Sequence, residues 1–397
     1  MFAARKKQLF LFSINVSAWE QDTAKNLFIP YRVKNSSNMN LVSYSVTNKD
    51  GFVNQNEYFD DGGKAVFADK KNSLIVSINT FAYNPSRINV GSLALYKHSE
   101  MGLVSPIYEV FQINNNNNPD FFLLWFRSEA FKNIVSTNSN KSVRDTLNLS
   151  QFESESVNFP NFAEQSKISS LFTHLDSLIT LHQRKLLSLK NLKSRLLDRM
   201  FCDEKSQFPS IRFKEFTNAW EQEKLGECSK FYNGLTSVSK SDFGVGKDLY
   251  IDYLNVFNNT FSQFSELKKF KNSSRQNYVQ FKDVILTISS ETPDEVAMSS
   301  VINWKNDYKN VAFNSFCILV RFNQLEKYDV NYIGYFFRSN SFRTQAMLMA
   351  QGISRFNINQ TALKKTLFLF PPNIYEQQKI GNVLYYLDSL ITLHQRG

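Results

Sequence analysis

The sequence predicts an α+β protein in which two globular segments of mixed helix and strand are separated by long helices. Three observations carry this prediction. The chain has 397 residues, which is more than one domain usually holds. A segment of ten residues occurs twice. Around each copy, apolar residues recur at intervals of three and four, the spacing of an amphipathic helix.

The repeat divides the chain into two halves. Residues 175–184 recur unchanged as residues 387–396, and the similarity extends back to 164–184 against 376–396 with 14 identities in 21 positions. A second echo relates residues 18–21 to 219–222. Between these echoes the sequences of the globular segments show no convincing match. A long repeat period with dissimilar intervening sequences is not typical of a solenoid, whose short repeats stack on their neighbours.

Each copy of the repeat belongs to a predicted helix, over residues 163–201 and 373–396, that begins just after proline and has a glutamate in its first turns. Two amphipathic helices with nearly the same apolar stripe are expected to pack on each other as a coiled coil. We predict that the contact is made by Ile168, Phe172, Leu175, Leu178, Ile179 and His182 in the central helix and by Ile380, Leu384, Leu387, Leu390, Ile391 and His394 in the terminal helix.

Both globular segments contain short runs of β-branched and aromatic residues typical of strands. In the first segment these runs are 74–78 and 90–96, and a helix is expected over 120–133. In the second segment the expected strands are 278–281, 284–288 and 316–322, and the expected helix is 330–349. The predicted organisation is a first globular domain at 1–160, a central helix at 161–205, a second globular domain at 206–370 and a terminal helix at 371–397.

The net charge and the cysteines indicate what kind of partner and which redox compartment to expect. The formal net charge is 46 − 36 = +10, which favours a polyanionic partner without identifying one. Residues 161–201 contribute 7 − 3 = +4 of this charge, so the globular segments are only mildly basic. Three scattered cysteines fit neither a disulfide framework nor a zinc site, and they favour a reducing compartment.

The chain offers little sign of membrane insertion or export. No run of eighteen apolar residues occurs, so we expect no spanning helix and no membrane partner. Basic residues 5–7 before the short apolar run 9–12 imitate a signal peptide, but polar Ser13 and Asn15 interrupt it. A first strand or an ordered arm is the preferred interpretation of this end.

No catalytic constellation is recognisable in the sequence. Gly244 and Gly246 lack the third glycine of a dinucleotide fingerprint. The segment 84–87 is Asn-Pro-Ser-Arg, which lacks the aromatic residue that would stack on a flipped base in an amino-methyltransferase. Four histidines are too few and too scattered for a metal cluster. We therefore predict no catalytic residues and no metal site in this chain, and we expect it not to act as an enzyme by itself.

The order of these features resembles the specificity subunit of type I restriction-modification systems, particularly those of low-GC Gram-positive bacteria and mycoplasmas. The motifs that carry the resemblance are the two Leu-Asp-x-x-Ile-x-Leu-His-Gln-Arg helices, the Met-Phe exit at 200–201, the Phe-Pro-x-Ile-Arg-Phe segment at 208–213 and the Trp-Glu-Gln segment at 220–227. The resemblance covers the whole chain and is strongest in residues 160–227 and 371–396.

The resemblance implies a function and a set of partners. Residues 1–160 and 206–370 would be two target-recognition domains, each reading half of a split site in double-stranded DNA. The two helices would form an antiparallel coil, related by a pseudo-two-fold axis, that sets the gap and docks two methyltransferase (M) subunits. S-adenosylmethionine would bind to the methyltransferase partner and ATP to the restriction or translocase (R) partner, with neither cofactor on this chain. The location implied is cytoplasmic.

One departure from the family pattern concerns the end of the sequence. The terminal copy stops at Gly397, where the central copy continues to Phe201. The distal half of the central helix, from Leu186 to Met200, is therefore expected to lack part of its partner stripe.

Three segments have the polar or basic composition needed to touch bases and phosphates. The first could equally be a structural turn and the second a solvated face, whereas the composition of the third favours a phosphate-gripping loop. The candidate DNA-binding residues are Asn84, Ser86 and Arg87 in the first segment, Lys268, Lys269, Lys271 and Arg275 in the second, and Ser354, Arg355 and Asn357 before the terminal helix.

Two other functions remain open. The signal-like start and modest charge leave room for a two-domain scaffold or surface protein with a coiled-coil spacer and no nucleic-acid role. A methyltransferase that acts alone would bind S-adenosylmethionine itself.

Overall fold

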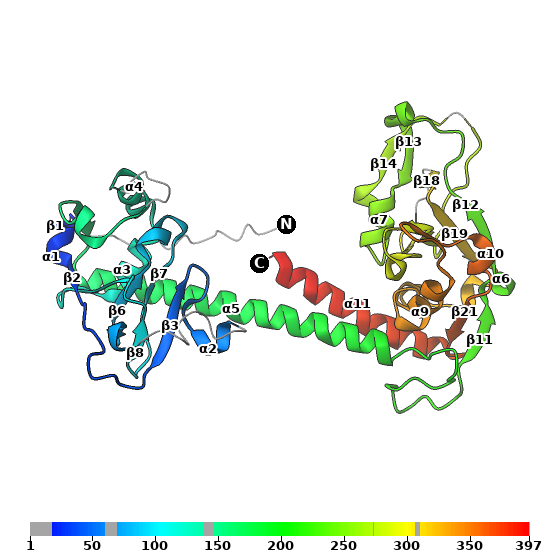
Figure 1. The fold of residues 1–397 in the computed structure, drawn as a ribbon. Coiled ribbons are helices and arrows are strands. Elements are labelled where there is room, and N and C mark those ends of the chain that lie inside the picture. The colour runs from blue at the N-terminus through cyan, green and yellow to red at the C-terminus, as the bar shows by residue number, and fades with distance from the viewer. Residues whose placement is uncertain (1–17, 60–69, 139–145, 273, 306–309, 397) are drawn as a thin grey trace, which may run out of the picture. The chain divides into compact units, whose positions relative to one another are not determined.

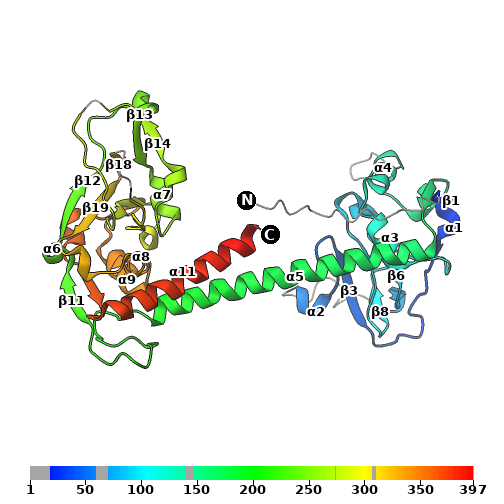
Figure 2. The same ribbon diagram turned by 180° about the vertical axis from the view of Figure 1, so that it is seen from behind.

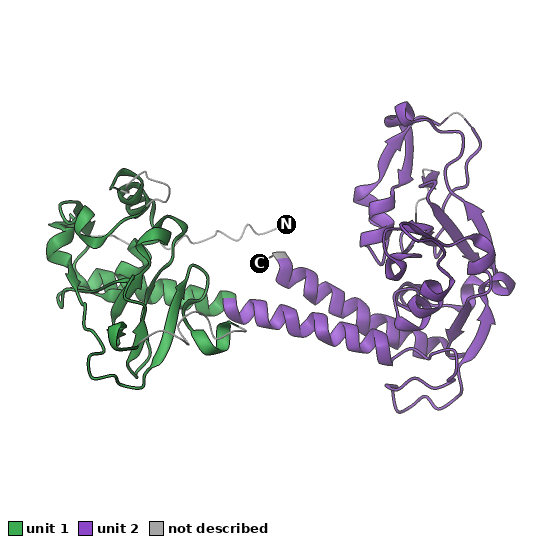
Figure 3. Ribbon diagram, in the orientation of Figure 1, with its two compact units in different colours: residues 1–179 green, residues 180–397 purple. Residues whose placement is uncertain are grey.

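The computed structural model describes residues 18–59, 70–138, 146–272, 274–305 and 310–396. The chain divides into two compact units, residues 1–179 and 180–397 (Figure 3). The expectations for residues 5–17 lie outside the described residues. Among those described, no helix is long and apolar enough to cross a membrane.

Unit 1, drawn from blue to green in Figure 1, is built on a four-stranded sheet with the order β2-β9-β6-β7 and a second sheet with the order β4-β3-β8-β5. Two further strands, β1 and β10, pair antiparallel where the chain enters and leaves the unit. The strands are β1 Glu20–Thr23, β2 Phe28–Pro30, β3 Val42–Thr47, β4 Gly51–Asn54, β5 Leu74–Val76, β6 Thr80–Tyr83, β7 Leu93–Leu95, β8 Gly102–Val104, β9 Glu109–Ile113 and β10 Ser156–Phe159.

Helices α3 and α4 of unit 1 pack against the β2-β9-β6-β7 sheet. An aromatic core that includes Phe28, Phe81, Phe111 and Trp125 joins the sheet to α3 and α4. The α-helices are α1 Ala24–Leu27, α2 Gln55–Tyr58, α3 Pro119–Trp125 and α4 Glu129–Asn138, and short 3-10 turns lie at Lys70–Asn72, Pro85–Val90 and Leu149–Phe152.

Unit 2 has the same plan. Its four-stranded sheet has the order β12-β19-β15-β17, β11 pairs with β21, and a third sheet has the order β14-β13-β18. The strands are β11 Glu221–Lys224, β12 Ser229–Asn233, β13 Phe243–Ile251, β14 Lys268–Phe270, β15 Val284–Thr287, β16 Ser289–Ser290, β17 Ser299–Val301, β18 Val311–Phe313, β19 Cys317–Phe322, β20 Phe356–Asn357 and β21 Leu367–Phe370.

The helices of unit 2 include the terminal one. They are α6 Leu225–Cys228, α7 Tyr253–Asn258, α8 Val330–Phe336, α9 Asn340–Met349, α10 Gln360–Leu363 and α11 Ile374–Arg396, with 3-10 turns at Lys240–Asp242, Phe264–Glu266, Pro293–Glu295 and Leu325–Lys327. Ile380 and Leu384 of α11 lie in the same apolar core as Tyr332 and Phe336 of α8, so α11 is anchored to the second globular body.

The globular halves share a topology that their sequences do not reveal. Strand by strand, β2, β9, β6 and β7 take the places of β12, β19, β15 and β17, and the parallel pair β3 with β8 matches the parallel pair β13 with β18. The reason is that strand pairing depends on the alternation of apolar positions rather than on residue identity. The halves are therefore duplicated in fold, although their sequences between the echoes look unrelated.

Most predicted elements are present with shifted bounds. The central helix α5 covers Phe162–Arg199 and α11 covers Ile374–Arg396. Each short predicted helix is interrupted, into α3 and α4 and into α8 and α9, at an Arg-Ser pair. The strand expected at 278–281 is wrong: this stretch is a loop whose Val279 N–H bonds to Val311. The strand expected to begin at Val90 begins at Leu93, since Gly91 takes a left-handed conformation that ends a 3-10 turn.

Candidate helix interface and nucleic-acid surfaces

In unit 2, the terminal helix α11 lies alongside the distal half of α5 (Figures 1 and 2). The ring nitrogens Nδ1 of His182 and His394 are 3.3 Å apart, and Lys193 forms a 2.5 Å ion pair with Asp388. Residue numbers rise along α5 as they fall along α11, so this pairing is antiparallel. His182 and His394 are also equivalent positions of the repeat, which makes their contact a local two-fold relation.

The predicted contact residues of α11 occupy one buried face. Ile380, Leu384, Leu387 and Ile391 are buried, whereas Leu390 lies beside this face and is exposed. His394 is half-buried and faces His182.

The predicted contact residues of α5 are placed differently. Phe172, Leu175, Leu178 and Ile179 are exposed, and Ile168 is half-buried against the core of unit 1. The distal positions Leu186, Leu189 and Leu196 are the ones partly buried, and Met200 is fully buried. The difference has a physical reason. Antiparallel pairing centred on His182 brings α11 against the residues that follow His182, so the residues that precede it stay open.

A glutamine of the repeat ties each long helix to its globular body. In unit 1, Gln165 accepts a 2.8 Å bond from the N–H of Asn118, the residue that caps α3, and donates at 2.7 Å to the carbonyl of Pro160. In unit 2, Gln377 accepts a 2.9 Å bond from the N–H of Asp329, which caps α8, and donates at 2.9 Å to the carbonyl of Pro371. Both amides are buried. Sequence reasoning missed this pair, although both glutamines lie in the aligned repeat.

The glutamate that precedes this glutamine in the repeat has side-chain partners in unit 2. Glu376 is buried and receives two bonds from Arg212, at 2.7 and 2.9 Å, and one at 3.3 Å from the indole of Trp220. The hydrogen bonds that Arg212 donates to Glu376 raise the pKa of the guanidinium, which stays protonated. Its counterpart Glu164 has no side-chain bond among the described residues.

The first candidate DNA segment forms a capped turn. The Asn84 side chain accepts a 3.0 Å bond from the N–H of Ser86, which starts the 3-10 turn Pro85–Val90. Arg87 is exposed at this turn, and its side chain has no bond among the described residues. The structure thus gives the Asn84 side chain a structural task and places Arg87 on the surface.

The basic candidates of unit 2 gather on and after an edge strand. Lys268 and Lys269 are exposed on β14, which pairs with β13 only. Lys271 and Arg275 follow and are also exposed, whereas Gln276 is buried and bonds to the backbone of Thr236. Four exposed cations therefore lie on β14 and in the loop that follows it, with Lys268 and Lys269 on opposite faces of the strand.

The last candidate segment is a hairpin. Gln351 and Asn357 exchange backbone bonds of 2.9 and 2.8 Å, and Ser354 and Arg355 are exposed between them. Arg355 borders a hollow of about 400 Å³ that is also lined by Tyr253, Leu254 and Phe316. Glu291 and Glu295 also line this hollow, so it combines aromatic surfaces for stacking with charges of both signs.

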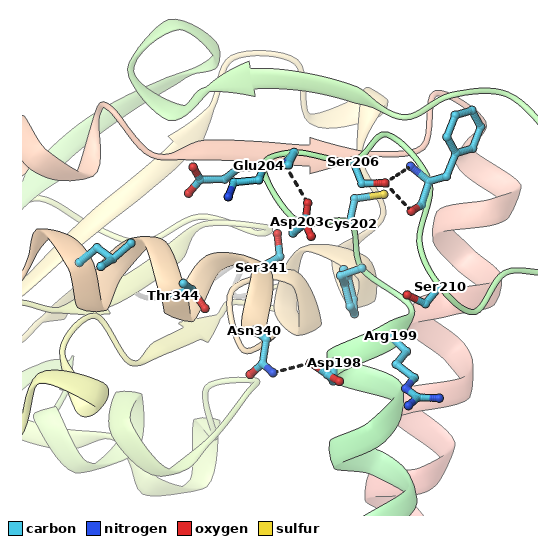
Figure 4. A pocket seen from close by; sticks show the side chains of 14 residues that line it. Asp198, Arg199, Cys202, Asp203, Glu204, Ser206, Ser210, Asn340, Ser341 and Thr344 are labelled. Carbon is cyan, nitrogen blue, oxygen red and sulfur yellow. Dashed lines mark hydrogen bonds between the residues drawn. The ribbon is translucent and has the colours of Figure 1, made fainter.

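A hollow of about 900 Å³ lies beside the end of α5 in unit 2 (Figure 4). Two of its acidic lining residues have structural partners: Asp198 accepts from Asn340 at 2.6 Å, and Asp203 accepts from the N–H of Lys205 at 2.8 Å. Burial raises the pKa of Cys202, which also lines the hollow, to about 12 and so favours the protonated thiol at neutral pH. No group of three metal-binding side chains occurs among the described residues.

Comparison with known proteins identifies the family. The family model for the type I restriction modification DNA specificity domain matches this chain twice, over residues 23–191 and 218–397. No curated protein matches the chain.

Three solved structures share its fold at 12% sequence identity. A protein from a study of complex assembly and conformational transition of the type I R-M system has a TM-score of 0.53, with 96% of this chain and 92% of that chain covered. The HsdS subunit from Thermoanaerobacter tengcongensis has a TM-score of 0.52, with 96% and 91% covered. The type I restriction-modification S subunit from M. genitalium has a TM-score of 0.52, with 97% and 93% covered.

The two matches of the family model together span most of the chain, one in each half, and the duplicated topology agrees with them. The chain belongs to the type I restriction-modification DNA specificity family, and it is the non-catalytic DNA specificity subunit of such a system.

Proposed function

We propose that each globular body reads one half of a bipartite DNA site, with residues 1–160 and 206–370 as the two target-recognition domains. The supporting observation is the duplicated frame. Both bodies have the same order of strands, and each is fastened to a copy of the repeat by an equivalent buried glutamine. Two bodies with one plan suit two half-sites on antiparallel DNA strands.

The surfaces proposed to touch DNA are the exposed cations at turns and edges. Arg87 in unit 1 and Lys268, Lys269, Lys271 and Arg275 in unit 2 have the charge to contact phosphates. Ser354, Arg355 and Asn357 are proposed as base or phosphate contacts of the hairpin 351–357. Asn84 and Ser86 act by shaping the turn that presents Arg87, because the Asn84 side chain is already bonded to the Ser86 N–H.

The experiment is an exchange of one domain. Residues 206–370 are replaced by the corresponding segment of another specificity subunit, and genomic adenine methylation is mapped in cells that also contain the methyltransferase. One half of the methylated sequence should change while the other half and the gap stay the same. A change in both halves, or in neither, would refute the assignment. The matched control exchanges residues 1–160, which should alter the other half.

The helices are proposed to dock the methyltransferase subunits and to set the distance between half-sites. S-adenosylmethionine and ATP would bind to the methyltransferase and translocase partners, and the complex would work in the cytoplasm. Calorimetry of the purified chain with S-adenosylmethionine tests the first point, because measurable binding would contradict it.

A further inference from the structure

A hollow of about 580 Å³ in unit 1 lies beside the break between α3 and α4, and we call it the α3–α4 hollow. It is lined by the apolar side chains of Phe126 and Phe131 and by two cations, Arg127 and Lys132. Among the described residues that line it, none is acidic. By contrast, carboxylates line both the hollow at the end of α5 and the hollow beside the hairpin 351–357. The charge of the α3–α4 hollow therefore favours an anionic ligand.

Neither cation has a buried partner among the described residues of unit 1. The Arg127 side chain is exposed and makes no bond to a described residue. Lys132 is 63% exposed and pairs with Glu129, which is 80% exposed and lies one turn earlier on α4. An ion pair that is exposed to this extent contributes little to stability. Both cations are therefore accessible to a ligand.

The equivalent cations of unit 2 are bonded to the chain itself. Helices α4 and α9 each have ten residues and follow the same Phe-Arg-Ser sequence, so Arg127 corresponds to Arg338. By the same alignment, Lys132 corresponds to Arg343. Arg338 donates to carbonyls at the end of α7, and Arg343 donates at 2.7 Å to the carbonyl of Ala297. These two positions thus bind oxygen acceptors in unit 2, whereas neither side chain bonds to a described backbone carbonyl in unit 1.

The α3–α4 hollow adjoins a surface already proposed to contact DNA. The 3-10 turn Pro85–Val90 carries the exposed Arg87, and Ile88 and Val90 of the same turn line the hollow. Three cations therefore belong to two adjoining elements, this turn and the α3–α4 break. A ligand with regularly repeated negative charges suits such a group of cations better than a single carboxylate does.

We propose that the α3–α4 hollow binds one phosphodiester of a DNA strand, with the phosphate oxygens on Arg127 and Lys132 and the deoxyribose against the apolar side chains. The inference rests on the proposed function, because it takes unit 1 to lie on DNA. Phosphate oxygens form strong, charge-assisted bonds with both arginine and lysine. Since Arg338 and Arg343 already bind carbonyls of the chain, unit 2 has no such site. The two units therefore contact DNA through different elements of the same fold.

Binding of duplex DNA to the assembled methyltransferase complex, measured by fluorescence anisotropy at several salt concentrations, tests the site. Arg127→Gln and Lys132→Gln should each weaken binding about fivefold and lower the salt dependence by about one counterion. Lys25→Gln removes the same charge and is the matched control, because Lys25 is exposed on α1 and does not line the hollow. All three positions are exposed, so the melting temperature of each variant should match that of the parent chain.

The outcomes distinguish this inference from the proposed function. If the parent complex binds DNA with steep salt dependence and both hollow variants bind as tightly as the parent, the α3–α4 hollow is not a DNA site and the inference is overturned. An equal loss in Lys25→Gln would overturn it too, because the effect would then be one of net charge. A parent complex that does not bind duplex DNA would overturn the proposed function, and the inference with it.

Neutral methylphosphonates, introduced into the DNA at one phosphate at a time, locate the contact. At the contacted phosphate, the substitution should weaken binding of the parent complex about as much as Arg127→Gln does, and it should weaken binding of the Arg127→Gln complex little further. This phosphate should lie in the half-site that exchange of residues 1–160 alters. Additive losses at every phosphate, or coupling in the other half-site only, would contradict the inference and leave the proposed function intact.

Hydrogen exchange distinguishes DNA from a protein occupant. Residues 126–132 should become protected when duplex DNA is added to the assembled complex. Protection that is complete once the methyltransferase subunit binds, before any DNA is present, would make a protein group the occupant of the hollow and overturn the inference.

Discussion

The sequence Phe-Arg-Ser occurs at residues 126–128 in unit 1 and at residues 337–339 in unit 2, each time at the break between two helices. In unit 2 the side chain of Arg338 donates to the carbonyls of Val256, Phe257 and Asn259 at the end of α7, and to Ser299. In unit 1 the equivalent Arg127 is exposed and has no side-chain bond among the described residues. The same local sequence therefore makes the same helix break but not the same tertiary bonds.

This contrast separates two levels of structure. The helix break is local and follows from the residues themselves, so it occurs in both units. The enclosure of the arginine depends on loop carbonyls from a distant part of the chain, and these converge only in unit 2 among the described residues. Burial lowers the pKa of Arg338 to about 10, so the guanidinium is still charged at pH 7 and every bond it donates is charge-assisted.

The largest loss of stability is expected on removing the ion pair of Glu376 with Arg212, which ties α11 to unit 2 and has no described counterpart at Glu164 in unit 1. Glu376→Ala leaves the Arg212 guanidinium and the Trp220 indole N–H without their buried acceptor, which should cost about 4 kcal/mol of unfolding free energy. Glu164→Ala in unit 1 loses only a favourable charge near a helix N-terminus, about 0.5 kcal/mol. Scanning calorimetry of both variants tests this difference. Equal losses of unfolding free energy would mean that the bonds of Glu376 to Arg212 and Trp220 contribute nothing beyond the interaction of a carboxylate with the helix dipole.

The Phe-Arg-Ser contrast predicts the next largest difference. Arg338→Met keeps much of the side-chain volume but leaves several carbonyls at the end of α7 unpaired, which should cost about 3 kcal/mol. Arg127→Met should change stability by less than about 0.5 kcal/mol, as for an ordinary surface substitution. Urea denaturation followed by intrinsic fluorescence measures both. A large loss in the Arg127 variant would show that this arginine is bonded in solution.

The two buried glutamines, Gln165 and Gln377, should contribute equally to the stability of the protein. Gln165→Leu and Gln377→Leu each leave a buried N–H of a helix cap and a proline carbonyl unpaired, so each should cost about 2 kcal/mol. Hydrogen exchange should report faster opening of α3 in the first variant and of α8 in the second. Loss of protection in one unit only would show that the two junctions are not energetically equivalent.

The sequence was sufficient for the features that depend on local pattern. The heptad spacing predicted α5 and α11 to within one or two residues at each end, and the repeat predicted the duplicated organisation. The glutamine pair and the Phe-Arg-Ser pair were present in the same sequence as identical residues at offsets of 212 and 211. They could have been found as repeats, but their hydrogen-bond partners could not, because those partners are backbone groups brought close only by folding.

The buried residues of the helix interface could not be predicted, because the sequence does not show in which direction the two helices pair. The spacing of Phe172, Leu175 and Ile179 is the same as that of Leu384, Leu387 and Ile391, so the pattern alone cannot tell which stripe is covered. The contacts of His182 with His394 and of Lys193 with Asp388 fix the half of α5 that α11 covers. The DNA-facing candidates are harder still, because charge and turn composition look alike in a solvated loop and in a reading loop.

The smallest effect is expected for the residues proposed to contact DNA, which we test with one cation from each unit. Arg87→Ala and Lys269→Ala should each weaken binding of the assembled methyltransferase complex to duplex DNA by about 1 kcal/mol and reduce the salt dependence by about one counterion. If both residues contact phosphates, the loss should be the same for a cognate and a non-cognate site. Lys190→Ala on the exposed part of α5 is the control and should leave the slope unchanged. Binding measured by fluorescence anisotropy at several salt concentrations distinguishes the cases: a loss confined to the cognate site would assign base reading, and no loss would remove that residue from the DNA surface of its unit.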